Sequence, residues 1–274
     1  MLDIRSCPTL VINLDRRKDR WDEFSKQSAL TQFKKLKRFS AVDGSKIDVL
    51  TDNRISLHTK QNIARKYRRS DYEINTPGAI GASLSHITCW RQFLESDAQH
   101  LVVFEDDTLV TEEYMKKIDA LIPTLPAWDM WLLGTHAWAF NGVPLTKDPK
   151  SWWKVSAFTG AHAYVLSRRG AEILLKNPFP IETHIEYYIC ACSQLNGLKI
   201  VRHPELRMKY SMELSLSDDS DTFDSFKSCP VCMIPDTFPY TGIYLSPLVL
   251  ERAAISIFAL GIVGYGLYKL KIGR

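Results

Sequence analysis

The sequence predicts an α/β fold, in which helices cover both faces of a mostly parallel sheet. Apolar strands alternate with helical segments along the chain, and the composition, 45% hydrophobic and 24% charged over 274 residues, is that of a globular protein with one large domain. Residues 101–104 are apolar and are followed at once by Glu105, Asp106 and Asp107. This pattern indicates a buried strand whose carboxyl end opens into a polar site.

The first elements follow from local periodicity. Residues 9–14 are apolar and predict a strand that ends in a polar pair at Asn13 and Asp15. Residues 16–28 then predict a helix, and residues 38–44 a short strand that closes in an Asp-Gly turn. Residues 47–74 are polar and basic, which indicates a surface excursion with a helix near residues 60–67.

A break at Thr76 to Ser83 begins an amphipathic helix whose first turn is small and rich in glycine. Such a helix start admits a ligand closely and favours anions, although close packing of the helix on the sheet explains it equally well. The later elements share clear local patterns: a helix at 111–121, a strand at 129–134, a polar and aromatic loop through Trp138, Trp152 and Trp153, a strand at 159–167 and a helix at 168–176.

The acidic cluster carries the chemistry. It is energetically costly for three adjacent carboxylates, Glu105, Asp106 and Asp107, to be ionised together unless they share a cation. Carboxylate oxygens are hard ligands, which suit magnesium, manganese or calcium. Such a metal typically bridges to an anion such as a diphosphate. A solvated acidic turn after a strand is the alternative.

Charge and cysteine content exclude several classes of protein. The net charge is only +4, and the basic runs at 34–38 and 65–69 fit either an anion site or solvated surfaces, so nothing indicates a nucleic-acid partner. Six cysteines in a chain of this length do not form a disulfide scaffold. The pair Cys229 and Cys232 lacks a second pair to complete a zinc site, and we expect reduced thiols.

The C-terminal segment differs in kind. Residues 253–268 carry no charge and are flanked by charged residues. As a helix they span roughly 24 Å, short of a bilayer core of about 30 Å, but glycines at this density are common in membrane helices. We predict a single-pass membrane anchor within residues 245–274 in preference to a buried helix, with a cytoplasmic catalytic domain. The N-terminus enters a strand without a basic and long apolar region, so no cleaved signal peptide is expected.

Six short motifs occur in order over about residues 8–220: Val11 to Asp15 with Arg20, Ala41 to Gly44, Gly78 to Gly81 with Ser85 and His86, Phe104 to Asp107, Leu132 to Gly134, and Gly160 to Ala171. Together they resemble glycosyltransferase family 25, which includes lipopolysaccharide glycosyltransferases and procollagen galactosyltransferases. The resemblance implies a single GT-A-type domain over residues 1–244. It also implies a metal-dependent, inverting transfer of a hexose, galactose or glucose, from a UDP-sugar to a hydroxyl of a glycan, glycolipid or glycoprotein.

The resemblance also implies roles for individual residues. Asp107, together with Asp106, holds Mn²⁺ or Mg²⁺, and Glu105 contacts the ribose or a metal-bound water. The nucleotide lies beside three residues, Asn13, Arg20 and Asp43, and the donor pocket is lined by three more, Gly81, Ser85 and His86. A purely structural histidine is the alternative for His86.

The general base is the least defined role. The family carries an aspartate after the helix at 168–176, whereas this chain offers Glu182 and Glu186. The spacing from the preceding helix favours Glu186 as the base, whereas the Pro-Ile pair directly before Glu182 favours Glu182. We predict that Glu186 is the base. Residues 215–219 resemble the closing Ser-Asp segment of the family. Two other hypotheses are a non-catalytic, membrane-tethered scaffold of the same fold and a carboxylate-metal phosphoesterase, which lacks an evident second cluster of metal ligands.

Overall fold

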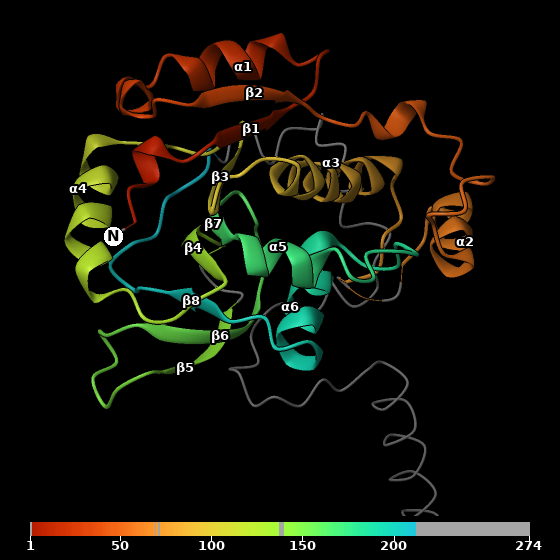
Figure 1. Ribbon diagram of the computed structural model, residues 1–274. Helices are drawn as coiled ribbons and strands as arrows, with labels where there is room; N and C mark the ends of the chain where they lie inside the picture. The colour runs from red at the N-terminus through yellow and green to blue at the C-terminus, as the bar shows by residue number, and fades with distance from the viewer. Residues whose placement is uncertain (1, 69, 71, 137–139, 212–274) are drawn as a thin grey trace, which may run out of the picture. The chain divides into compact units, whose positions relative to one another are not determined.

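A computed structural model describes residues 2–68, 70, 72–136 and 140–211 (Figure 1). All of these except Ser70 belong to one structural unit. The predicted anchor at 245–274, the pair Cys229 and Cys232 and the segment 215–219 lie outside the described residues. No helix within the described ranges has the length and apolar character needed to cross a bilayer.

The core of the fold is a mixed sheet, whose strands in the order β2-β1-β3-β7-β4-β8-β6-β5 are visible in Figure 1. Their bounds are β1 Thr9–Asn13, β2 Leu36–Ser40, β3 His100–Glu105, β4 Met130–Gly134, β5 Phe140–Pro144, β6 Trp153–Phe158, β7 Ala163–Ser167 and β8 Ile200–Arg202. Among the described strands, β1 pairs in parallel with β2 and β3, and β4 with β8. The remaining four pairings are antiparallel.

The prediction of a mostly parallel sheet was therefore wrong, and the reason lies between β4 and β7. The sequence predicted a loop through Trp138, Trp152 and Trp153, but the structure has the antiparallel pair β5 and β6 there. Because the chain returns to the centre of the sheet without a crossover helix, β7 enters between β3 and β4 in the antiparallel direction. The short strand β8 was not predicted.

Helices cover both faces of the sheet, as predicted (Figure 1). Their bounds are α1 Lys18–Ser25, α2 Leu57–Arg65, α3 Pro77–Leu94, α4 Glu112–Leu121, α5 Arg168–Leu174 and α6 Ile185–Leu195. Alternate residues of β3 point to opposite faces: Leu101 and Val103 pack in the cluster formed with α3, α5 and α6. Val102 and Phe104 pack in the cluster formed with α1 and α4. Helix α6 had not been predicted from the sequence.

The excursion at residues 47–75 has a small core of its own. Apolar side chains from this segment, from α3 and from residue 181 form it: Val49, Ile55, Ile74, Ala79, Ile80, Leu84 and Ile181. Helix α2 begins after Ser56, whose hydroxyl accepts a hydrogen bond from the Thr59 N–H, and it starts earlier than the predicted residue 60. The excursion is therefore packed against the domain and is more than a solvated loop.

Candidate active site

The site forms where two neighbouring parallel strands end. Strand β1 pairs with β3 in a register that places Ile12 opposite Glu105, so Asn13 lies at the same edge as the acidic cluster. The chain then turns into α1, which carries Arg20 back towards that edge. Asn13 and Arg20 contact the acidic cluster directly, whereas their predicted role in binding a nucleotide stays a prediction.

Asp106 and Asp107 are buried and share one arginine. The Asn13 side-chain amide donates a hydrogen bond of 2.6 Å to Asp106. Arg20 Nε lies 3.1 Å from the other oxygen of Asp106, and Arg20 Nη2 donates to Asp107 Oδ2 at 3.2 Å. Each aspartate is only 7% exposed, so the alternative of a solvated acidic turn is wrong. The second oxygen of Asp107, Oδ1, is buried without a hydrogen-bond partner among the described residues.

The protonation equilibria reflect this crowding of carboxylates. Burial raises the pKa of Asp107 to about 8, and the charges of Glu105 and Asp106 act in the same direction against Arg20. Burial also raises the pKa of Asp106, although Arg20 and the Asn13 amide oppose it. Burial acts to raise the pKa of Glu105 as well, but the hydrogen bond from His86 and nearby positive charge, that of Arg20 included, together outweigh it, and the net pKa is lowered. One arginine does not fully compensate the three acids.

These residues fit part of a divalent-cation site. The bare oxygen of Asp107 and its neighbour Asp106 supply hard oxygen donors, which Mg²⁺ and Mn²⁺ prefer. Within the described part of the chain, however, no group of three or more His, Cys, Asp or Glu side chains gathers as a metal site. The arrangement therefore matches ions held by one or two carboxylates, with substrate phosphates and waters as the other ligands.

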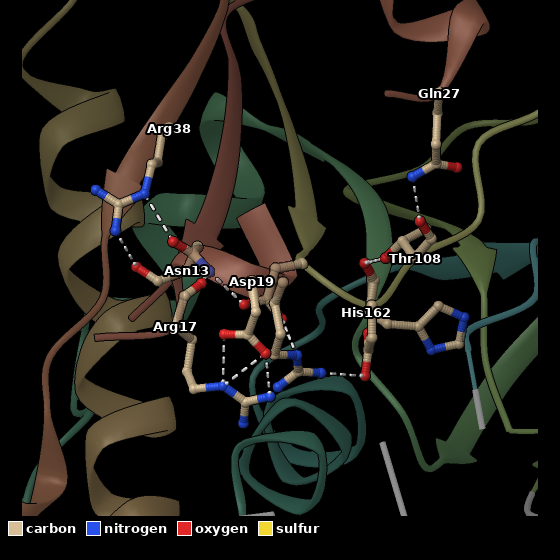
Figure 2. A network of polar contacts seen from close by, with 10 residues as sticks. Asn13, Arg17, Asp19, Gln27, Arg38, Thr108 and His162 are labelled. Atoms are coloured by element: carbon tan, nitrogen blue, oxygen red, sulfur yellow. Dashed lines mark hydrogen bonds and ion pairs between the residues drawn. The ribbon is translucent and has the colours of Figure 1, made fainter. Parts of the chain in front are cut away.

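A polar network that the sequence had not indicated fixes Asn13 (Figure 2). Arg38 on β2 donates to the Asn13 side-chain oxygen at 2.7 Å and to Asp15 at 2.8 Å. The Asn13 amide nitrogen also donates to the Arg17 carbonyl at 3.0 Å. The parallel register, with Val11 opposite Arg38, brings this arginine to the site, whereas the sequence had shown it as the end of a basic run and the start of a predicted strand.

A chain of buried hydrogen bonds leads from the core to Glu105. The Trp90 indole N–H donates to the Tyr164 hydroxyl at 2.9 Å, and that hydroxyl lies 2.9 Å from His86 Nδ1. An indole is only a donor, so the single proton of the Tyr164 hydroxyl is available for His86 Nδ1, which then accepts. In this arrangement the His86 proton is on Nε2, which lies 3.4 Å from a Glu105 oxygen. His86 is thus neither free nor capping a carbonyl; it supports Glu105.

The glycine-rich start of α3 is occupied by packing within the protein. A side chain on Gly81 would come within 2.5 Å of the Val42 carbonyl oxygen and 2.7 Å of the Gly44 nitrogen. The Ser85 hydroxyl accepts from the Val42 N–H at 2.8 Å and donates to the Gly81 carbonyl at 2.7 Å. The close-packing alternative therefore accounts for these residues, and a contact of Gly81 or Ser85 with a donor stays a prediction.

Asp43 is predicted to contact the nucleotide, and in the structure it organises a turn. Its carboxylate accepts hydrogen bonds from the backbone and hydroxyl of Ser45, at 3.1 and 2.7 Å. Its other oxygen lies 3.5 Å from Arg16 Nε. The hydrogen bonds from Ser45 and, to a smaller extent, the charge of Arg16 lower the pKa of Asp43 against the opposing effect of burial, so Asp43 is anionic at neutral pH. Its role towards a nucleotide is untested.

The two candidate bases differ in their surroundings. Glu186 lies in the first turn of α6 and accepts a hydrogen bond of 3.2 Å from the Gly160 N–H. Burial raises the pKa of Glu186, backbone hydrogen bonds oppose this, and the charge of Glu105 adds to it, which places Glu186 in the electrostatic neighbourhood of the acidic cluster. Glu182 is exposed, and its backbone carbonyl accepts from Thr59. The geometry favours Glu186 as the residue that faces the site.

Aromatic residues that sequence reasoning missed border Asp107 on the other side. The Ser211 N–H donates to the Asp107 carbonyl at 2.8 Å, and Tyr210 bridges to Thr108. The Tyr210 ring packs 5.3 Å from that of His162, and burial together with the charge of Asp107 raises the pKa of Tyr210. Figure 2 shows His162 next to Thr108, whose hydroxyl donates to the His162 carbonyl at 2.6 Å. The motif from Gly160 to Ala171 contains His162, but no motif had marked Thr108, Tyr210 or Ser211.

Comparison with known proteins matches this arrangement to a family. The family model described as "Glycosyltransferase family 25 (LPS biosynthesis protein)" matches residues 7–143, half of the chain, including β1, α1 and the acidic cluster. The chain belongs to glycosyltransferase family 25. The resemblance inferred from the six motifs is thereby confirmed.

The relatives in family 25 include one named as a galactosyltransferase and one named as inactive. The chain is 25% identical to human procollagen galactosyltransferase 2 over 182 residues, which cover 62% of this chain and 27% of that protein. It is 31% identical to "Inactive glycosyltransferase 25 family member 3" of Mus musculus over 112 residues, 36% of this chain and 18% of the relative. The chain thus spans about a quarter or less of these two relatives.

Among solved structures, UDP-glucose pyrophosphorylase complexed with UDP-glucose is similar with a TM-score of 0.39 and 10% identity, over 75% of this chain and 92% of that chain. A similarity of this size adds nothing to the family assignment.

Proposed function

We propose that this chain is a metal-dependent, inverting glycosyltransferase that transfers a hexose from a UDP-sugar to a hydroxyl of a glycan, glycolipid or glycoprotein. Membership of family 25 supports the reaction class. The observation that carries the metal-dependent part is the buried, unpartnered Oδ1 of Asp107 within a cluster of three consecutive acids. A buried carboxylate oxygen without a partner is costly, and it is retained where a ligand completes it.

In this proposal the residues of the chain act by position and charge. Asp107 and Asp106 hold Mn²⁺ or Mg²⁺, which stabilises negative charge on the leaving UDP. Arg20 keeps both carboxylates oriented. Asn13, fixed by Arg38, holds the strand end at which we place the nucleotide. Glu105, held by His86, faces the ribose or a water on the metal.

Glu186 is the proposed base. Inversion by direct displacement requires a group that removes the proton from the acceptor hydroxyl as this oxygen attacks the anomeric carbon. Burial keeps the pKa of Glu186 above its ordinary value, which makes it a better proton acceptor than a solvated carboxylate. Its hydrogen bond from Gly160 occupies one oxygen and leaves the other for the acceptor.

The decisive experiment is a donor screen on the full-length chain. Nucleotide release is measured from a panel of UDP-sugars with Mn²⁺, with and without a chelator, in the wild type and in Asp107→Asn. The matched control is Asp22→Asn, which changes an exposed aspartate on α1. We expect chelator-sensitive release from one donor, lost in Asp107→Asn and kept in Asp22→Asn. Full release by Asp107→Asn would exclude the proposed metal role.

A non-catalytic domain of the same fold is the second candidate. One observation favours it: a relative that is 31% identical is named as inactive. The departure from the family's aspartate at Glu186 agrees with this alternative. Binding of UDP without turnover of any UDP-sugar, in the presence of a wide range of acceptors, would support it.

A further inference from the structure

The excursion at residues 47–75 forms a cradle around the segment that precedes Glu186. Ile55 bridges to Ile181 in parallel, and Glu73 bridges to Thr183 in the antiparallel direction. Residues 181–183 therefore lie between two stretches of the excursion, as the middle strand of a small ladder. The side chain of Ile181 belongs to the apolar core beneath this ladder. The excursion thus fixes the backbone that leads into α6.

Tyr72 is held against the first turn of α6 by this ladder. The His184 N–H donates to the Tyr72 carbonyl at 3.1 Å, and His184 is the N-cap residue of α6. The rings of Tyr72 and Tyr187 meet edge to face, with centroids 5.9 Å apart and an interplanar angle of 64°. Tyr187 directly follows Glu186 in the chain. The first turn of α6, which carries Glu186, therefore also carries Tyr187, and the excursion brings Tyr72 against that turn.

Tyr72 is 49% exposed although it is large and aromatic. Its edge-to-face contact covers only part of the ring, so one aromatic surface remains open to solvent. The face of an aromatic ring carries partial negative charge, whereas the C–H bonds on the apolar face of a pyranose are weakly positive. A sugar ring stacked there gains both apolar burial and electrostatic complementarity. A hydroxyl group on a peptide acceptor offers no flat apolar surface that could stack on the Tyr72 ring in this way.

We infer that Tyr72 and Tyr187 form the acceptor subsite and that the acceptor is a saccharide whose ring stacks on Tyr72. The inference rests on the proposed function, because it assigns the acceptor side of the reaction to the surface next to Glu186. It also gives the excursion a role: its ladder and small core hold the stacking surface at a fixed place relative to the base.

The test measures saccharide binding separately from catalysis. Saturation-transfer NMR records binding of methyl β-galactopyranoside and methyl β-glucopyranoside to the full-length chain in the presence of UDP and Mn²⁺. The variants are Tyr72→Ala, Tyr72→Phe and the matched control Tyr67→Ala, since Tyr67 is exposed to a similar extent, 43%, in the same excursion. UDP binding is measured by calorimetry on the same samples.

We expect Tyr72→Ala to weaken saccharide binding by about two- to tenfold, the range of an aromatic stacking contact. Tyr72→Phe keeps the ring and should bind like the wild type, as should Tyr67→Ala. Equal binding by Tyr72→Ala and the wild type overturns the inference. Binding of UDP but of neither saccharide by the wild type also overturns the inference. That result leaves the proposed donor chemistry intact. Absence of UDP binding overturns the proposed function and, with it, this inference.

Discussion

Replacing Tyr164 with phenylalanine tests the buried chain of hydrogen bonds that supports Glu105. The hydroxyl contacts Trp90 Nε1 and His86 Nδ1, each at 2.9 Å, and the Tyr164 side chain is fully buried. Tyr164→Phe leaves both nitrogens without their partner. Each buried polar group left unpaired costs about 1–3 kcal/mol, so the loss of both partners should lower the free energy of unfolding by about 2–6 kcal/mol. This is a large share of a typical total of about 5–15 kcal/mol.

Urea unfolding of matched variants measures this effect. Tyr188→Phe is the control, because the Tyr188 hydroxyl belongs to a half-buried side chain and donates to the Leu174 carbonyl at 2.7 Å, so its loss should cost about 1 kcal/mol. A double-mutant cycle with Trp90→Phe isolates the pair: in the Tyr164→Phe background, the indole N–H is already unpaired, so its removal should cost less. Equal costs for Tyr164→Phe and Tyr188→Phe, together with additive effects in the cycle, would refute the proposed bridge.

The same variant has a spectroscopic signature. The hydrogen-bond chain assigns the His86 proton to Nε2, and nitrogen NMR of the histidine side chains distinguishes the two tautomers. We expect His86 to be the Nε2-protonated form in the wild type and to lose this strict preference in Tyr164→Phe. A wild-type His86 protonated on Nδ1 would contradict the assignment, since Tyr164 could not then donate to it.

Three further predictions concern other parts of the site. Arg20→Met removes the cation shared by two buried aspartates and should lower the free energy of unfolding by about 3 kcal/mol, measured in urea. Glu186→Gln should reduce kcat about 10²- to 10⁴-fold, whereas the exposed Glu182→Gln should leave it nearly unchanged. The base must be deprotonated, so the acidic limb of kcat/KM should lie above the ordinary glutamate value of 4.5 and be absent in Glu186→Gln. Gly81→Ala should destabilise the fold by about 1–3 kcal/mol, because its methyl group would lie 2.5 Å from the Val42 oxygen.

Sequence periodicity predicted the central strands well and the edge poorly. Strands β1 and β4 are buried throughout, and β3 is buried over its apolar residues 101–104, so such runs are visible without any knowledge of their partners. Strand β6 is buried only at Val155 and Phe158, and β8 has three residues, so neither has enough pattern to be recognised. The antiparallel direction of β7 depends on its neighbours, which no local pattern records.

The residues of the site also divide into those that the sequence predicted and those that it did not. The three carboxylates were predicted to form a site because three consecutive acidic residues directly after an apolar strand are an unusual pattern. Arg38 was missed because only the parallel register of β1 and β2 places it over Asn13. Tyr164 and Trp90 were missed because a buried tyrosine and a buried tryptophan are ordinary core residues in a sequence. Their role becomes visible only when the donor and acceptor atoms are followed from one side chain to the next.

Charge balance connects the buried acids to the proposed reaction. Glu105, Asp106 and Asp107 bring up to three negative charges to one strand end, and Arg20 contacts two of them. The pKa of Asp107, raised to about 8, shows that the protein alone leaves this charge incompletely compensated. Arg20 occupies one oxygen of Asp107, and the other is left bare. In the proposed function, a cation would take the bare oxygen of Asp107, and an anionic donor would supply further ligands to that cation.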